Sequence, residues 1–195
     1  MNPPPLLYIP NLKQSRAIFL DRDGTLIEEK KYLRRPEQVV LFPGAAAALC
    51  RLRQAGFKLF LVSNQSGVGR GLFTLDDVAT VNARLLADLG RQEVLLDKIY
   101  IAPEAPGQPS RGRKPSPQFL FDARDEFSLC LEESFLIGDK MIDLQCGWNA
   151  GVKKSILVRT GYGREVETAA DPRLTAALIV DDLPAAAAWI LSPVP

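Results

Sequence analysis

The 195-residue sequence contains no histidine, and this absence removes several kinds of catalytic chemistry. Ser-His-Asp triads, phosphohistidine intermediates and zinc sites with histidine ligands all need an imidazole. Cysteine is scarce: Cys50, Cys130 and Cys146 are odd in number, far apart and without a C-x-x-C pair, which predicts reduced, buried thiols in a reducing compartment. Acid–base catalysis must therefore come from carboxylates, lysine or tyrosine.

The chain also lacks an excess of either charge and any long apolar run. It has 24 basic and 23 acidic residues, a net charge of +1, so we expect no nucleic-acid partner. No apolar run approaches the ~20 residues of a membrane-spanning helix, and the opening MNPPPLLYIP is too short and too rich in proline for a signal peptide. We therefore expect a cytoplasmic protein without a membrane partner, and we expect it to be a monomer.

What the sequence does contain is an alternation of short apolar runs with helical patterns, which is typical of βαβ units. Strands are predicted at 17–20, 58–63, 98–101, 135–137, 155–158 and, at one edge, 177–180. Helices are predicted at 44–55, 74–90, from 116 onward, at 140–150 and at 184–191. The sequence thus predicts a single Rossmann-like α/β domain over 1–195, with a parallel sheet, helices on both faces, a core over about 16–191 and frayed ends at 1–5 and 192–195.

Polar residues gather where four of these apolar runs end or the next helix begins. The segments are DRDGT at 21–25, SNQSG at 63–67, RKP at 113–115 and GDK at 138–140. Ligands of open α/β sheets bind outside the carboxyl ends of the strands. We therefore expect these four segments to meet in one site.

The residue types in that site predict phosphate chemistry. Asp21 and Asp139 brought close together would repel each other unless a hard cation such as Mg²⁺ lay between them. Lys114 and Lys140 would then bind an anionic substrate, and a phosphate satisfies both the cation and the lysines. Of the two acids after the first strand, Asp21 and Asp23, one can attack phosphorus while the other protonates the leaving oxygen and later activates water.

At this point the sequence resembles the haloacid dehalogenase (HAD) superfamily of Mg²⁺-dependent phosphatases. The matching motifs are Asp-x-Asp-Gly-Thr at 21–25, a strand-ending Ser63, Lys114, and Gly-Asp-Lys-x-x-Asp at 138–143, in the family's order. The resemblance implies that Asp21 is the nucleophile and Asp23 the acid/base. It also implies that Ser63 and Lys114 stabilise the transferring phosphoryl group, and that Asp21, Asp139 and the backbone carbonyl of Asp23 hold Mg²⁺.

Within that superfamily, the segments DRDGT, SNQSGVGRG, RKPSP and IGDKMIDLQCG look most like the heptose 1,7-bisphosphate phosphatases, with the histidinol-phosphatase domain a close relative. The substrate implied is a small phosphorylated metabolite. The substrate contacts implied are Glu29, Lys30, Lys31, Tyr32, Asn64, Gln65, Ser66, Arg113 and Lys140.

One loop of the sequence departs from the family pattern, and the two segments that border the site are short. Members of this branch commonly carry a zinc loop of three cysteines and one histidine before the Arg-Lys pair, whereas the segment 101–115 has neither residue type, so we expect no zinc. The segments 26–42 and 102–112 are too short for a cap domain, and we expect an open site. Their basic residues are hypothesised to hold a second anionic group of the substrate: Lys30, Lys31, Arg34, Arg35, Arg111 and Arg113.

Two other functions remain open on the sequence. The chain could be a phosphatase for another small metabolite, such as histidinol phosphate or a nucleotide. It could instead be a non-catalytic protein that keeps the HAD fold, although the key residues are intact at all four motif positions.

Overall fold

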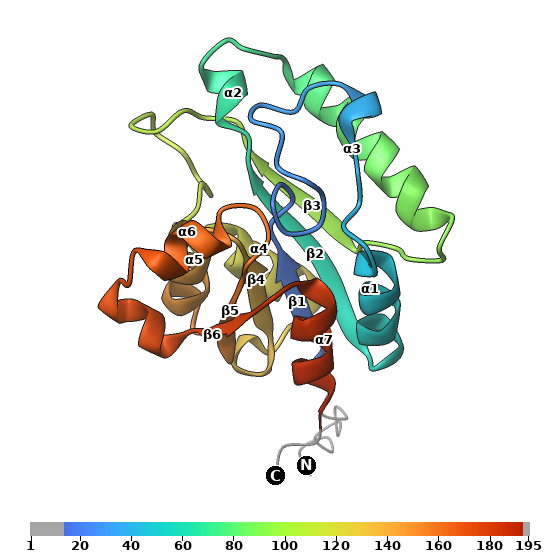
Figure 1. The fold of residues 1–195 in the computed structure, drawn as a ribbon, viewed down its shortest axis with the longest axis vertical. Helices are drawn as coiled ribbons and strands as arrows, with labels where there is room; N and C mark the ends of the chain where they lie inside the picture. The colour runs from blue at the N-terminus through green and yellow to red at the C-terminus, as the bar shows by residue number, and fades with distance from the viewer. Residues whose placement is uncertain (1–13, 193–195) are drawn as a thin grey trace, which may run out of the picture.

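Residues 14–192 are described by the computed structural model, and they form a six-stranded parallel sheet between helices (Figure 1). The strands are β1 (Arg16–Leu20), β2 (Phe57–Asn64), β3 (Lys98–Ala102), β4 (Phe135–Gly138), β5 (Lys154–Val158) and β6 (Leu178–Val180). Their order in the sheet is β3-β2-β1-β4-β5-β6. The strand order reverses beside β1, and such a reversal opens a crevice at the carboxyl ends of the strands.

Helices cover both faces of the sheet, as the sequence predicts. The α-helices are α1 (Ala45–Gln54), α2 (Ser66–Gly69), α3 (Leu75–Gly90), α4 (Gln118–Phe127), α5 (Met141–Ala150), α6 (Gly163–Thr168) and α7 (Leu183–Leu191), with short 3₁₀ turns at Pro36–Gln38, Leu131–Glu133 and Pro172–Ala176. Side chains alternate along β1 because successive residues of a strand point to opposite faces. Ile18 and Leu20 pack in a core with α1, α3 and α7, whereas Ala17 and Phe19 pack with α4 and α5.

The register of the central strands brings their polar ends to one level. Leu20 pairs with Leu61 of β2 and with Ile137 of β4, and the N–H of Asp21 donates to the carbonyl of Ile137 at 3.0 Å. The residues that follow β1 and β4, Asp21 and Asp139, are therefore neighbours at the edge of the sheet.

Capping interactions fix where the flanking helices begin. Thr74 Oγ1 accepts from the N–H of Asp77 at 3.1 Å and the Asp77 carboxylate accepts from the N–H of Thr74 at 2.7 Å, the reciprocal capping box that the sequence predicts for α3. Asp182 Oδ1 caps α7 by accepting from the N–H of Ala185 at 2.8 Å.

Most of the predicted elements are confirmed, with end shifts of a residue or two. The short helix α2, which begins within the polar segment 63–67, and the helix α6 after β5 were not predicted. Cys146 is buried, but Cys50 and Cys130 are only half-buried, and all three are free thiols. The ends predicted to fray lie outside the described residues, apart from Ser192.

The segments that border the site are short. Between β1 and α1 the chain forms isolated bridges and one 3₁₀ turn, and residues 103–117 between β3 and α4 contain no helix or strand. The described chain therefore has no cap domain over the carboxyl ends of the strands. Among residues 14–192, no helix is long and apolar enough to cross a membrane.

Candidate active site

Lys114 lies at the centre of a buried group of charges at the tip of β1. Its Nζ is 2.6 Å from Asp21 Oδ1, 2.6 Å from Asp143 Oδ1 and 2.7 Å from the carbonyl oxygen of Val62. The exposed fraction of the Lys114 side chain is only 2%. Three oxygen acceptors thus hold the ammonium group in place, and the nearby carboxylates offset the cost of burying its charge.

The pKa values of the two acids beside Lys114 shift in opposite directions. Burial alone raises the pKa of Asp21, but Lys114 and Lys140 outweigh burial and bring that pKa below its ordinary value. Burial dominates at Asp143 and raises its pKa in spite of Lys114. Burial lowers the pKa of Lys114, but Asp143 and Asp21 more than reverse this effect. Asp21 is therefore the acid of this group that stays ionised most readily.

Asp139 is a fully buried carboxylate beside Asp21. Its Oδ2 accepts from the N–H of Tyr162 at 2.9 Å, whereas its Oδ1 accepts no hydrogen bond from residues 14–192. Burial, followed by the charge of Asp21, raises the pKa of Asp139 to about 8. Gly24 and Gly161 both approach this carboxylate so closely that a Cβ would lie 2.1 and 2.2 Å from its Oδ2, so only glycine leaves room for it.

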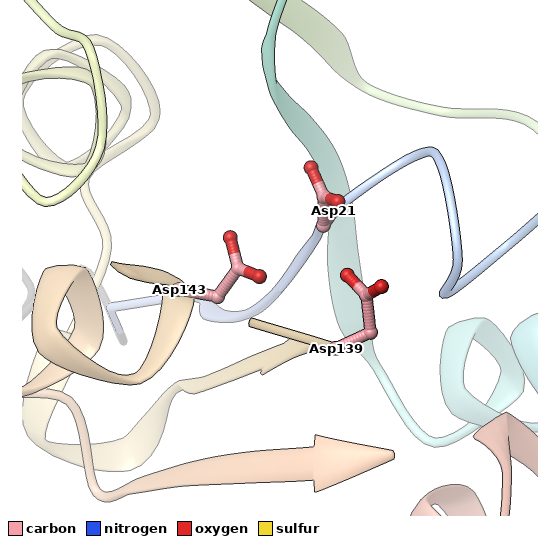
Figure 2. A group of neighbouring side chains, drawn as sticks. All are labelled: Asp21, Asp139 and Asp143. Atoms are coloured by element: carbon pink, nitrogen blue, oxygen red, sulfur yellow. The ribbon is translucent and has the colours of Figure 1, made fainter. Parts of the chain in front are cut away.

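Three carboxylates of this region fit a divalent cation. Figure 2 shows Asp21, Asp139 and Asp143 gathered at the ends of β1 and β4 and the start of α5, and one oxygen of each lies within 4.8 Å of the others. Clustered oxygen ligands suit a hard cation such as Mg²⁺. Asp139 Oδ1 is the specific sign, because a buried carboxylate oxygen that accepts no hydrogen bond is costly, and Lys140 Nζ, its nearest cation among the described residues, is 3.5 Å away.

The carboxylate of Asp23, two residues after Asp21, is held by two donor side chains. The guanidinium of Arg22 donates to both of its oxygens, and Gln65 Nε2 donates to Oδ2 at 3.0 Å. The same Gln65 nitrogen is 2.7 Å from Ser63 Oγ. Burial raises the pKa of Asp23 although Arg22 opposes the shift, so this carboxyl takes up a proton more readily than Asp21 does.

A cavity of about 420 Å³ opens over these charges. Most of the residues predicted to bind substrate line it: Glu29, Lys31, Tyr32, Asn64, Gln65, Ser66, Arg113 and Lys140, together with Asp21, Asp23 and Lys114. Lys140 Nζ is 3.2 Å from Glu29 Oε2 and 3.5 Å from Asp139 Oδ1. The lining of the cavity therefore combines cationic side chains with the carboxylates of Asp21 and Asp23.

Some of the residues selected from the sequence do not line this cavity, among them Ser63, Lys30 and Arg111. The buried Ser63 lies beneath the cavity, where its hydroxyl oxygen accepts from Gln65. Lys30 lies outside the cavity and pairs with Glu28, and Arg111 pairs with Asp122 on α4. The basic loop residues thus do not all face the same space.

The structure adds residues that sequence reasoning missed. Tyr162 supplies a backbone donor to Asp139, and its ring lies 4.9 Å from Lys140 Nζ. Phe73 lines the cavity. The signal for Tyr162 was its place just after β5, because the ends of parallel strands meet at this edge; Phe73 follows no strand and gave no such signal.

Comparison with known proteins agrees with this geometry. A family model described as HAD-hydrolase-like matches residues 112–186. The D-glycero-D-manno-heptose-1,7-bisphosphate 7-phosphatase of Chlorobaculum tepidum is 38% identical over 167 residues, covering 79% of this chain and 83% of the relative. The corresponding enzyme of Escherichia coli is 37% identical over 168 residues, covering 82% and 88%.

The chain belongs to the heptose bisphosphate phosphatase family. A crystal structure of the D,D-heptose 1,7-bisphosphate phosphatase from B. bronchiseptica, complexed with magnesium and phosphate, superposes with a TM-score of 0.84 at 30% identity, covering 90% of this chain and 98% of that one. Family membership confirms the resemblance to HAD phosphatases that the motifs indicate, including the α/β fold.

Proposed function

We propose that this protein is a Mg²⁺-dependent phosphatase that hydrolyses heptose 1,7-bisphosphate to heptose 1-phosphate through an aspartyl-phosphate on Asp21. The observation that carries the proposal is the ion pair of Asp21 with the buried Lys114 at the floor of an open cavity. A carboxylate kept ionised by a lysine is a nucleophile beside a cation that can bind the phosphate it attacks. The names of the relatives support the sugar bisphosphate as the substrate.

Asp21 and Asp23 have different roles in the two half-reactions. Asp21 attacks phosphorus as the bond from phosphorus to the sugar oxygen breaks, and the protonated Asp23 gives its proton to that oxygen. In the second half-reaction Asp23 takes a proton from the water that attacks phosphorus, and Asp21 leaves as a carboxylate. The raised pKa of Asp23 suits this exchange.

Lys114 and Ser63 are assigned to the oxygens of the transferring phosphoryl group. Gln65 donates to Ser63 Oγ, so the hydroxyl proton of Ser63 stays available for a phosphoryl oxygen. The guanidinium of Arg113 donates to the carbonyl of Glu104 at 2.8 Å, and this bond fixes the side chain. Arg113 also lines the cavity, where we assign it to substrate recognition.

Mg²⁺ would be held by Asp21, Asp139 and the backbone carbonyl of Asp23, and it would neutralise charge on the phosphate during transfer.

The absence of zinc stays a prediction from the sequence. Residues 104–113 are held together by polar contacts: Ser110 Oγ donates to Glu104 Oε2 at 2.7 Å and accepts from the N–H of Arg113 at 3.1 Å.

At a pH well above 8, where Asp139 with its pKa of about 8 is ionised, Asp139→Asn is expected to raise the melting temperature in EDTA by about 2–8 °C, since it removes a buried charge worth on the order of 1–2 kcal/mol in a chain of this size. It is also expected to abolish the stabilisation that Mg²⁺ gives the wild type. Thermal unfolding with and without Mg²⁺ measures both effects. The exposed Asp125→Asn is the control, and a Mg²⁺ shift retained in Asp139→Asn would contradict the ligand assignment.

The second phosphate of the substrate is assigned to the basic side of the cavity. A neighbouring hollow of about 440 Å³ is lined by Lys31, Arg34 and Arg35, and Lys31 lines both spaces. Arg34 Nη1 donates to the carbonyl of Leu72 at 3.2 Å, so a substitution of Arg34 would also break a contact within the chain, and Lys31 and Arg35 are the cleaner positions for a test.

Lys31→Asn and Arg35→Gln are each expected to raise KM for a sugar bisphosphate about 10-fold and to leave KM for the matching monophosphate unchanged, because each loses one charged contact to the second phosphate. Asparagine is chosen because it tolerates the left-handed backbone at position 31, where φ is 46°. Steady-state kinetics on the paired substrates measures the ratio. Arg111→Ala, outside the cavity, is the control; equal increases on both substrates would refute the assignment.

The proposed function is tested by phosphate release, with and without Mg²⁺, from both anomers of heptose 1,7-bisphosphate, other sugar phosphates, histidinol phosphate and nucleotides. A strong Mg²⁺-dependent preference for a heptose bisphosphate is expected. Flat activity across the panel would favour another metabolite, and no release from any ester would favour a non-catalytic protein. The monomeric state and cytoplasmic location stay predictions.

A further inference from the structure

Arg22 lies between the two acids of the first motif, yet none of its surface is exposed to solvent. Each of its three side-chain nitrogens has an acceptor. Nε donates to Asp23 Oδ2 at 3.1 Å, Nη2 donates to Asp23 Oδ1 at 3.3 Å, and Nη1 donates to Asn82 Oδ1 at 2.8 Å. The guanidinium therefore joins the Asp23 carboxylate to one particular residue of α3.

Stability alone does not account for this arrangement. Replacing a buried ion pair by apolar side chains of similar volume is often neutral or stabilising, so the pair is not required for a well-packed interior. Arg22 also does not line the cavity, whereas Asp23 does, with 16% of its side chain exposed. A rigid, fully engaged arginine behind a partly exposed carboxylate is suited to fixing where that carboxylate points.

Asn82 completes the arrangement from a distance of 60 residues in sequence. It is buried on α3 beside Val81 and Leu85, which belong to the hydrophobic core on that face. The capping box at the start of α3 and this packing fix the height and rotation of the helix. The position of Asn82 is thus set by the fold and not by the cavity, to which α3 contributes no residue within the described chain.

We propose that Arg22 and Asn82 are positioning residues that hold the Asp23 carboxyl in line with the leaving oxygen. The inference rests on the proposed phosphatase function. In the step that it serves, the bond from Asp21 to phosphorus forms, the bond from phosphorus to the leaving oxygen breaks, and the proton of Asp23 passes to that oxygen. A misdirected Asp23 slows this proton transfer without removing the nucleophile or its lysine.

A leaving-group series separates this role from a structural one. An aryl oxygen of low pKa, as in p-nitrophenyl phosphate, departs without a proton, whereas unsubstituted phenyl phosphate and alkyl phosphates need one. For Asn82→Leu and Arg22→Met we expect kcat/KM, which covers the steps up to departure of the leaving group, to fall about 10²-fold on phenyl and alkyl phosphates, the low end of general-acid contributions. On p-nitrophenyl phosphate we expect kcat/KM to fall less than about 3-fold, because its leaving oxygen needs no proton and the later attack of water does not enter kcat/KM.

Val81→Ala is the matched control, since it removes buried volume next to Asn82 without touching Arg22. It is expected to lower the melting temperature and to leave the dependence on the leaving group unchanged. Asn82→Leu keeps the test decisive if Arg22→Met does not fold.

Any of three results would overturn the positioning role. These are an equal fall of kcat/KM across the whole series, no fall at all in Asn82→Leu, or the same selective fall in Val81→Ala. Wild-type protein that hydrolyses none of these aryl, alkyl and sugar phosphates with Mg²⁺ would contradict the proposed function itself, and the positioning role would fall with it.

Discussion

Asp21→Asn is expected to lower turnover by about 10⁴-fold or more, as removal of a covalent nucleophile does in other enzymes. The amide keeps the shape of the side chain but cannot attack phosphorus. Asp23 remains in place, yet it lacks the lysine contact that keeps Asp21 ionised. A second carboxylate therefore cannot take over the role.

The fold is expected to survive this substitution, with a melting temperature within about 4 °C of the wild type. Lys114 keeps Asp143 as a partner, and the repulsion between Asp21 and Asp139 disappears. Turnover and thermal unfolding measured on the same preparation separate lost chemistry from lost structure. Asp125→Asn on the surface is the control, and substantial residual turnover in Asp21→Asn would refute the nucleophile assignment.

Lys114→Met is expected to damage both activity and stability. Turnover should fall by about 10²–10³-fold, the usual cost of losing one donor to the developing charge. The free energy of unfolding should fall by about 3–5 kcal/mol, because two buried carboxylates lose their counterion. Both acids, Asp21 and Asp143, lie within 2.6 Å of the same nitrogen, so neither has a substitute partner of equal proximity.

A double variant separates the two consequences. Lys114→Met with Asp143→Asn removes one of the two uncompensated charges, so denaturant unfolding is expected to show part of the lost stability restored. Turnover is expected to stay as low as in the single variant, since the phosphoryl group still lacks its cation. The exposed Lys153→Ala is the control, and recovery of turnover in the double variant would contradict the catalytic role of Lys114.

The sequence predicted the sheet and the meeting of its polar ends because both depend on local patterns. An apolar run that stops at an acid indicates a strand with a functional tip, and parallel strands place such tips at one edge. These patterns place Asp21, Asp139 and Lys114 in one expected site and predict a cation between the two acids.

Contacts that depend on packing far along the chain were beyond that reasoning. Nothing local indicated that Arg22 is buried, because its partner Asn82 comes from a helix 60 residues away. Lys30 and Lys31 looked equivalent in the sequence, but successive left-handed residues at 31 and 32, with φ of 46° and 61°, separate their directions. Such backbone conformations are unusual for residues other than glycine and follow from the surrounding fold.

The proposed phosphatase reaction depends on the passage of a phosphoryl group through Asp21. The most direct measurement is to mix the wild type with substrate and Mg²⁺, quench the reaction in acid within the first turnover, and determine by mass spectrometry which peptide carries a phosphoryl group. We expect a hydroxylamine-sensitive phosphoryl group on Asp21, absent without Mg²⁺ and absent in Asp21→Asn. Turnover with no phosphorylated peptide, or with the group on Ser63 or another residue, would contradict it.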